Sequence, residues 1–213
     1  MTDTLDMGPM YAYHGALRRD LEHLAKVTAR TDDDPRRVLA TAVGWELFKK
    51  ALHVHHTAED EALWPPLREA VAGRSDDLSL LKAMEDEHAA IDPIIESIDT
   101  TLADREAAPD RLGELTDSLT TALTAHLKHE EDEVLPLIQA TLDLQQWRHF
   151  GEHSGRLVGP DASRIIPWML DGADDHIVAT MLAPLPEPVR AAYQNEWVPA
   201  YKALNLWNSS PRV

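Results

Sequence analysis

The segment AHLKHEEDEVLPL, residues 125–137, places two histidines and four acids inside an apolar pattern. Imidazole nitrogens and carboxylate oxygens are donors with which proteins bind iron, manganese or zinc. A carboxylate that faces an apolar core without a partner is costly to bury, and a second carboxylate nearby adds repulsion. Metal cations would remove both penalties, so the residue types in this segment indicate a cation site.

The same pattern occurs earlier in the chain. The segment LHVHHTAEDEALWPPL, residues 52–67, aligns with LTAHLKHEEDEVLPLI, residues 123–138, at one constant offset. The alignment pairs His55 with His126 and Glu59 with Glu130. A second constant offset pairs Met10 with Met84, His14 with His88 and Leu21 with Ile95. The chain therefore contains two copies of a helix pair, and each copy contributes one lone histidine and one His-x-x-x-Glu motif.

Helical geometry should bring these side chains together. Residues four positions apart on a helix lie one turn apart on the same face, so each His-x-x-x-Glu motif presents both side chains in one direction. Two hairpins packed with pseudo-twofold symmetry would gather four imidazoles and two carboxylates in one interior layer. The predicted metal ligands are His14, His55, Glu59, His88, His126 and Glu130. Two cations bridged by the two glutamates would best compensate their burial.

Four long helices must position this layer. Apolar residues recur at steps of three and four positions in the regions 10–24, 45–62, 81–102 and 112–130, and we find no alternating strand pattern. The polar breaks between these regions are TDDDP (31–35), AGRSDD (72–77) and AAPD (107–110). The pattern predicts an all-α fold, an antiparallel up-down four-helix bundle built from two helical hairpin repeats and followed by a C-terminal helical extension.

The chain divides near residue 146, where the sequence becomes irregular and gains aromatic, glycine and proline residues. We expect residues 1–145 to form the four-helix bundle. Residues 146–213 are expected to form a helical extension that packs on the bundle. The sequence leaves open whether this extension covers one end, forms a dimer surface or guards an entrance.

Composition excludes several classes of function. The chain carries 20 Lys and Arg against 37 Asp and Glu, for a formal net charge of −17, which argues against nucleic acid and anionic membranes as partners. It has no cysteine, which excludes disulfides, thiol catalysis and iron–sulfur clusters held by thiolates. The N-terminal residues lack the features of a secretion signal, and no segment approaches membrane-spanning length. A cytoplasmic location is expected.

The motif pattern resembles the hemerythrin-like (HHE cation-binding) family over roughly residues 8–140. That family has a lone histidine on its first and third helices and His-x-x-x-Glu, followed by a proline, on its second and fourth. The resemblance implies a non-haem di-iron centre, two iron ions with an oxo or hydroxo bridge, held by the six residues above. It also implies that Glu59 and Glu130 are the bridging carboxylates.

The third helix departs from the oxygen-carrying members of that family, which have a second histidine one turn after the first. Here Asp92 takes that position, followed by Pro93. Asp92 is open to three interpretations, as a metal ligand, as a partner of a bound water or as a solvent-facing residue. His56 and His129 each adjoin a predicted ligand, and each is either an extra ligand or an outer residue. Glu131 and Asp132 are expected to face solvent. Five other histidines fall outside the repeat and are taken as ordinary residues: His23, His53, His149, His153 and His176.

A di-iron centre of this kind should react with a small ligand such as O2, H2O2 or NO, because six or seven protein ligands do not saturate two octahedral ions. The missing histidine, and Tyr11 and Tyr13 beside His14 as proton or electron donors, favour peroxide chemistry. The expected role is oxidative or nitrosative stress handling, by peroxide disproportionation or reaction with nitric oxide. As an enzyme, the protein would be a di-iron oxidoreductase with catalase-like activity.

Two other classes of function stay open at this stage. One is a non-catalytic protein that binds or senses oxygen, nitric oxide or iron. The other is an interaction module with a structural metal, in which the aromatic extension contacts a partner. A ferritin-type oxidase is disfavoured, because EDEH (85–88) supplies a Glu-x-x-His motif with no counterpart in the other copy. Iron–sulfur cluster repair is disfavoured by the absence of cysteine.

Overall fold

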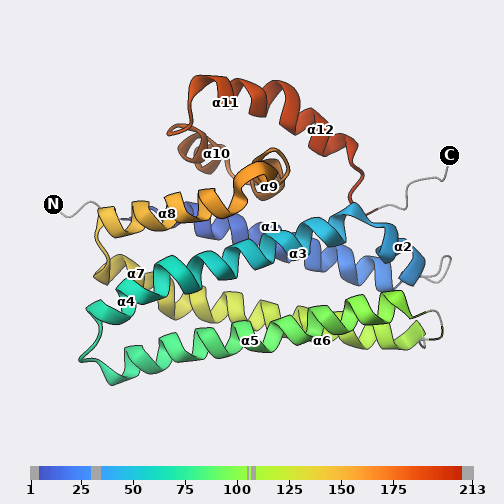
Figure 1. Ribbon diagram of the computed structural model, residues 1–213, viewed down its shortest axis with the longest axis horizontal. Coiled ribbons are helices and arrows are strands. Elements are labelled where there is room, and N and C mark those ends of the chain that lie inside the picture. The colour runs from blue at the N-terminus through green and yellow to red at the C-terminus, as the bar shows by residue number, and fades with distance from the viewer. Residues whose placement is uncertain (1–4, 30–34, 105, 107–108, 208–213) are drawn as a thin grey trace.

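The computed structural model describes residues 5–29, 35–104, 106 and 109–207, except for the side chains of residues 36, 37, 41 and 109. Helices make up its regular structure, and no strand occurs among the described residues (Figure 1). The prediction of an all-helical protein is therefore confirmed for this part of the chain. Most residues of the two predicted breaks at 31–35 and 107–110 lie outside the described residues. None of the described helices combines the length and the apolar character needed to span a bilayer.

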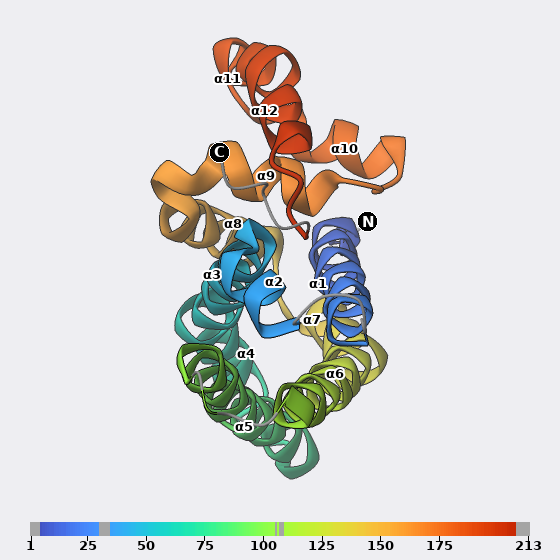
Figure 2. The same ribbon diagram turned by 90° about the vertical axis from the view of Figure 1, so that its right-hand side faces the viewer.

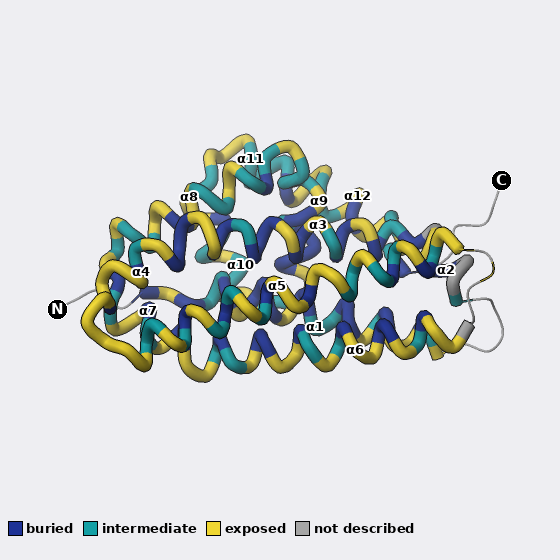
Figure 3. The backbone as a smooth tube through the Cα atoms, turned by 60° about the horizontal axis from the view of Figure 1, so that its bottom comes forward, coloured by how far each residue is buried: buried dark blue, intermediate teal, exposed yellow. Residues whose placement is uncertain are grey.

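Four long helical rods lie side by side (Figures 1 and 2). The first rod is α1 (Gly8–Thr28), and the short α2 (Pro35–Thr41) precedes the second. The second rod consists of α3 (Val43–Ala58), η1 (Glu59–Leu63) and α4 (Trp64–Ala70); the third is α5 (Ser75–Ala103); the fourth consists of α6 (Pro109–His129), η2 (Glu130–Val134) and α7 (Leu135–Thr141). Buried residues follow the inward sides of the rods, as Figure 3 shows.

The apolar core consists of two clusters, one on each side of the histidine and glutamate positions. On α1, Met10 belongs to one cluster and Leu17 to the other, and His14 lies between them in the sequence. The second rod shows the reverse order. Leu52, before its histidine, belongs to the same cluster as Leu17, and Leu63, after that histidine, belongs to the same cluster as Met10. A polar layer therefore interrupts an otherwise apolar interior.

The second and fourth rods each contain a π-helical turn that begins at a predicted ligand. The amide of Trp64 donates to the carbonyl of Glu59, and that of Leu135 donates to the carbonyl of Glu130, both five residues back. Prolines follow at once, at positions 65, 66 and 136. A proline lacks the amide hydrogen and clashes with the carbonyl four residues earlier, so the wider π turn accommodates it. Such turns often mark functional positions in helices.

The C-terminal helices lie on one side of the rods: the earlier ones contact α1 and α3, and the last ones lie farther out and pack on the earlier ones (Figures 1 and 2). They are α8 (Leu144–Val158), η3 (Gly159–Asp161), α9 (Ala162–Leu170), α10 (Asp175–Leu182), α11 (Glu187–Ala192), η4 (Tyr193–Trp197) and α12 (Val198–Ala203). The side chain of Asp143 caps α8 by accepting from the amide of Gln146, and the side chain of Gln146 accepts from the amide of Asp143. This reciprocal pair fixes where the chain turns back onto the rods.

Asp20 of α1 anchors this C-terminal region. Its carboxylate is 1% exposed and accepts a hydrogen bond on each oxygen, from Trp168 Nε1 at 2.7 Å and from Trp207 Nε1 at 3.3 Å. Gly44 of α3 holds the end of the segment, because its amide donates to the Leu206 carbonyl at 2.8 Å. A Cβ at that position would lie 2.6 Å from the Trp207 ring, so the close approach requires glycine.

We predict that Asp20 makes the stability of the protein depend on pH. Burial raises the pKa of Asp20 from 3.8 to about 6, although the two indoles oppose the shift. At a pH between these two pKa values, the carboxyl of Asp20 is protonated in the folded protein and ionised in the unfolded protein. The free energy of unfolding therefore falls as pH rises through this range. Relative to wild type, Asp20→Asn should gain about 2 kcal/mol between pH 4 and pH 7. Urea unfolding of both proteins at the two pH values measures this change, and a constant difference would contradict it.

Candidate metal centre

Each rod contributes to one buried layer. His14 lies on α1 and His88 on α5, His55 lies on α3 and His126 on α6, and the two glutamates begin η1 and η2. The six predicted ligands are between 0% and 5% exposed, and the structure brings all six together. Helical spacing explains this convergence, because the histidine and the glutamate of each motif share one face.

The candidate ligand atoms form two groups, in each of which one atom per residue lies within 4.8 Å of the others. The first group consists of His14, His55, Glu59 and Glu130, and the second consists of His56, His88 and His126. His56 is therefore a member that the repeat alone did not place, because Leu127 occupies the matching position in the second copy.

Glu59 faces both groups. Its Oε1 lies 3.3 Å from His55 Nε2, and its Oε2 lies 3.5 Å from His88 Nε2. The two oxygens of one carboxylate thus point toward different sets of imidazoles, which is the arrangement of a bridging ligand. Glu130 Oε2 lies 3.1 Å from His14 Nε2. Within the sets, His14 Nε2 lies 3.1 Å from His55 Nε2, and His88 Nε2 lies 3.2 Å from His126 Nε2.

The buried oxygens of both glutamates lack hydrogen-bond donors. The nearby imidazole nitrogens do not meet them with hydrogen-bonding geometry, so all four oxygens and His56 Nε2 are unsatisfied among the described residues. Buried polar atoms of this kind are costly unless something else binds them. The convergence of carboxylate oxygens and imidazole nitrogens is a donor set that fits divalent transition-metal ions.

The electrostatics of the layer without a cation are unfavourable. Burial and the neighbouring Glu130 raise the pKa of Glu59 well above its usual range. Burial lowers the pKa of both His55 and His56 well below the usual value. Burial also lowers the pKa of His14, but Glu130 and Glu131 outweigh it and raise the pKa to about 9. Cations would instead stabilise neutral imidazoles and ionised carboxylates throughout the layer.

Outer carboxylates orient three of the imidazoles. His14 Nδ1 lies 2.8 Å from Glu131 Oε1, which also accepts from Arg18. His88 Nδ1 lies 3.0 Å from Asp60 Oδ1, at the position that matches Glu131 in the other copy. His126 Nδ1 likewise lies 2.9 Å from Glu87 Oε2. A carboxylate at Nδ1 fixes the tautomer that leaves Nε2 free to bind a metal.

The prediction that Glu131 faces solvent was wrong. Its side chain is only 18% exposed, because it follows the buried Glu130 within the π turn η2 and joins His14 and Arg18. The wider turn changes the angular position of residues relative to the uniform α-helix on which the prediction rested. Asp132 is exposed, as expected, and forms an ion pair with Lys128.

The remaining candidates lie outside the two groups. Asp92 is exposed, and His129, whose side chain is 30% exposed, bonds Glu87 Oε1 through its Nδ1 at 2.8 Å. Tyr11 is exposed, whereas the buried Tyr13 donates its hydroxyl to the carbonyl of Ala51 at 2.8 Å. Burial raises the pKa of Tyr13. Its hydroxyl is thus bound to backbone and does not point to the metal ligands as a proton donor.

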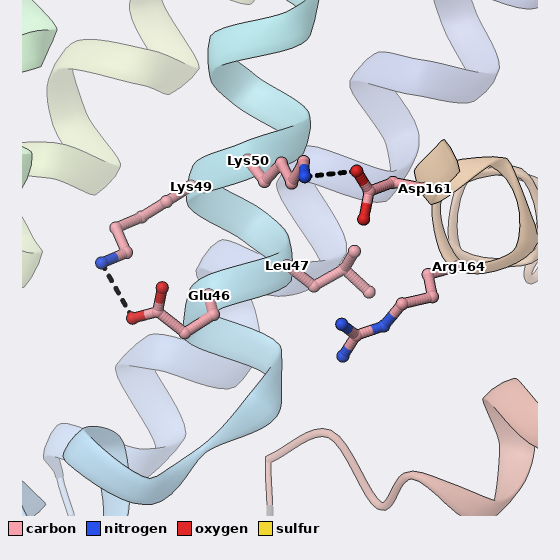
Figure 4. A pocket seen from close by; sticks show the side chains of 6 residues that line it. All are labelled: Glu46, Leu47, Lys49, Lys50, Asp161 and Arg164. Atoms are coloured by element: carbon pink, nitrogen blue, oxygen red, sulfur yellow. Dashed lines mark ion pairs between the residues drawn. The ribbon is translucent and has the colours of Figure 1, made fainter. Parts of the chain in front are cut away.

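A surface pocket of about 400 Å³ lies between α3 and α9, separate from this layer (Figure 4). It is lined by Glu46, Leu47, Lys49, Lys50, Asp161 and Arg164. Its lining residues form two ion pairs. One joins Lys49 to Glu46 within α3, and the other joins Lys50 of α3 to Asp161 of η3. None of the lining residues belongs to the donor groups, so the pocket takes no part in the candidate metal centre.

Comparison with known proteins agrees with this geometry. The family model of the hemerythrin HHE cation binding domain matches residues 9–138, which confirms the resemblance. Two zinc finger BRUTUS-like proteins of Arabidopsis thaliana are similar to the chain. One is 25% identical over 195 residues, covering 81% of this chain and 16% of the relative. The other is 23% identical over 215 residues, covering 92% and 17%. The chain thus spans about a sixth of the length of these relatives. No solved structure matches it.

We predict that Glu130 is required for metal binding. Glu130→Gln keeps the shape of the side chain but removes its charge, so bound metal should be lost together with the thermal stabilisation that metal gives. Elemental analysis and thermal unfolding measure both effects. Glu133→Gln, at a side chain 62% exposed, is the matched control. Full metal content in Glu130→Gln would refute the assignment.

We also predict that Glu131 tunes metal affinity without binding the metal. Glu131→Gln should weaken affinity about 10- to 100-fold, because His14 loses the carboxylate that fixes its tautomer. Competition titration against a chelator measures the change. The neighbouring exposed residue provides the control, since Asp132→Asn should leave affinity unchanged. Equal affinities for the two variants would contradict a role for the Glu131 contact.

Proposed function

The chain belongs to the hemerythrin HHE cation-binding family, and on this premise we propose that it is a non-haem di-iron protein that reacts with hydrogen peroxide. The observation that carries the proposal is the set of buried Glu59 and Glu130 oxygens, which face five imidazoles and have no hydrogen-bond donor in the part of the chain that the structure describes. In the proposed site, one iron takes the group of His14, His55, Glu59 and Glu130, and the other takes His56, His88 and His126. Glu59 and Glu130 would hold both ions, as the family resemblance implies.

The proposed architecture is an antiparallel up-down four-helix bundle of two hairpin repeats over residues 1–145, with residues 146–213 as its extension. The order of the two apolar clusters along the chain supports this arrangement. Each successive rod passes from one cluster to the other in the direction opposite to the rod before it. Antiparallel neighbours joined by short turns have this property.

Iron is chosen over manganese and zinc on the strength of the family resemblance, because all three metals accept this donor set. Bound iron would supply a Lewis acid and electrons for a small oxygen- or nitrogen-centred ligand. The surrounding residues restrict that ligand. The seven donor side chains are at most 6% exposed, so O2, H2O2 or NO fits the layer and a bulky substrate does not. The negative net charge predicts that the protein binds neither nucleic acid nor membranes, and the sequence predicts a cytoplasmic location. Both stay predictions.

The outer shell supports peroxide chemistry over reversible oxygen binding. Turning over peroxide moves protons, and His14 connects to the partly exposed Glu131 and Arg18 through hydrogen bonds. Asp60, which bonds His88, is exposed. Protons therefore have a route between the layer and solvent that does not involve a tyrosine. We propose a role in oxidative or nitrosative stress handling, by disproportionation of peroxide or by reaction with nitric oxide.

A second function, non-catalytic binding or sensing of oxygen, nitric oxide or iron, is supported by one specific observation. The metal donors come from all four rods, so that loss of the cations would leave repulsive carboxylates at the point where the rods meet. Metal occupancy would then control the packing of the protein, which is the coupling that a sensor requires.

One sequence of measurements separates these functions. The protein is loaded anaerobically with ferrous iron, analysed for iron content, and then treated with azide or hydrogen peroxide while absorption and gas evolution are recorded. Two iron ions per chain and steady gas evolution are expected. A reversible oxygenated charge-transfer band without turnover would favour the binding protein. Iron that does not react with azide or peroxide would refute the peroxide reaction and the binding of a small ligand, and would leave iron sensing; Glu130→Gln serves as the unloaded control.

A further inference from the structure

The two copies of the repeat differ at several positions beside the candidate metal donors, and one of these differences places an aromatic ring against a candidate ligand. Glu87 in the second copy bonds His126, whereas Tyr13 occupies the matching position in the first copy. The Tyr13 ring stacks on His55, with ring centroids 4.6 Å apart and an angle of 14° between the planes. On this side of the centre, a candidate ligand therefore contacts an aromatic ring where the other copy has a carboxylate.

The aromatic contact continues into the C-terminal extension. The edge of Tyr13 meets Trp168 of α9 at a centroid distance of 5.4 Å and an angle of 74°. Trp168 is fully buried, and its Nε1 donates to Asp20 Oδ2 at 2.7 Å. The other oxygen of Asp20 accepts from Trp207, whose ring stacks on the partly exposed His23 at 5.8 Å. A continuous series of contacts thus links the metal donors to the surface.

We propose that Trp168 and Asp20 form a redox pair that passes electrons one at a time from the protein surface toward the metal centre. This pair would give the protein a peroxidase activity in addition to disproportionation, with a small one-electron reductant of the ascorbate class as the second substrate. The inference rests on the proposed reaction with hydrogen peroxide. Disproportionation requires no electrons from outside, so the two activities are separable by experiment.

The hydrogen bond to Asp20 is what distinguishes Trp168 from the other aromatic rings near the centre. An indole that loses an electron must lose its Nε1 proton to become a neutral radical, and Asp20 Oδ2 is positioned to accept it. Tyr13 donates instead to a backbone carbonyl, which is not a base. Trp64, whose ring lies 6.3 Å from that of His88, has no acceptor for its buried Nε1 among the described residues.

Burial of Asp20 suits it to this role. Its pKa of about 6 leaves the carboxylate ionised at neutral pH and more basic than an exposed aspartate. The second copy has Ile94 at the matching position, so the pair exists only on the side that the extension covers. The structure otherwise gives a buried carboxylate between two indoles no role beyond anchoring the extension.

The proposed reaction balances. Hydrogen peroxide takes up two electrons and two protons to give two water molecules, and each of two ascorbate molecules supplies one electron and one proton. In each transfer, Trp168 gives an electron toward the centre through Tyr13, and its Nε1 proton moves to Asp20. Ascorbate then reduces the indolyl radical, and the proton returns to Nε1. Trp168 and Asp20 end the cycle unchanged.

The experiment locates the radical by spectroscopy. Iron-loaded protein is mixed with hydrogen peroxide, freeze-quenched and examined by electron paramagnetic resonance, with natural and ring-deuterated tryptophan. We expect a tryptophan radical whose hyperfine splitting changes on deuteration and which Trp168→Phe abolishes. Trp168→Phe should also slow peroxide-dependent ascorbate oxidation by about tenfold or more while iron content and gas evolution persist. Asp20→Asn, which keeps the ring, should lower the radical yield as well.

Trp45→Phe is the matched control. Trp45 is also buried and donates from Nε1 to a carboxylate, Asp99, at 2.7 Å, but it stacks on Phe48 and not on a candidate ligand. This variant should keep both the radical and the ascorbate oxidation. If Trp168→Phe does not fold, Asp20→Asn decides the question.

The outcomes distinguish the relay from the proposed function. A radical on Tyr13 or Trp64, or Trp168→Phe behaving like Trp45→Phe, would overturn the relay and leave the peroxide reaction standing. A full radical yield in Asp20→Asn would also overturn it. Iron that does not react with peroxide would overturn both the relay and the function on which it rests.

Discussion

Two buried carboxylates, for which the described residues supply no hydrogen-bond donor, are the constraint around which this protein is organised. Glu59 and Glu130 occupy the one layer where all four rods meet, and that layer divides the apolar core into two clusters. Apolar packing on both sides holds the layer together, although the carboxylates repel each other. A fold that keeps such a layer gains most from cations at its centre, because they balance both carboxylates and use the imidazole nitrogens at once.

Duplication explains the inner donors, and divergence explains their surroundings. Asp60 and Glu131 still occupy matching positions and make matching contacts to the lone histidines of opposite copies. Other pairs have diverged, since Arg18 matches the exposed Asp92 and Tyr13 matches Glu87. One half of the layer is thus bordered by aromatic rings and the other by an additional carboxylate. The two halves present different electrostatic environments to chemically similar ligands.

The extension follows this asymmetry. It packs on the side of α1 and α3, where Asp20 receives both indoles and Gly44 allows the Trp207 ring to approach α3 closely. Ile94 takes the place of Asp20 in the second copy, so the equivalent face of α5 offers no acceptor. A buried carboxylate with two indole donors fixes the extension in one orientation, because a shifted arrangement would leave its oxygens unpaired.

The sequence by itself determined the helical character of the chain, its family and the six side chains that meet in the buried layer, because the helical period places His14, His55, Glu59 and their counterparts at core-facing positions. Tertiary structure alone decided the rest. His56 has no counterpart in the repeat, Glu131 turns inward within a π turn, and Tyr13 meets Trp168 from a distant helix. Periodicity sets the direction of a side chain about its own helix axis, whereas local changes of helical register and contacts between distant segments depend on how the elements pack.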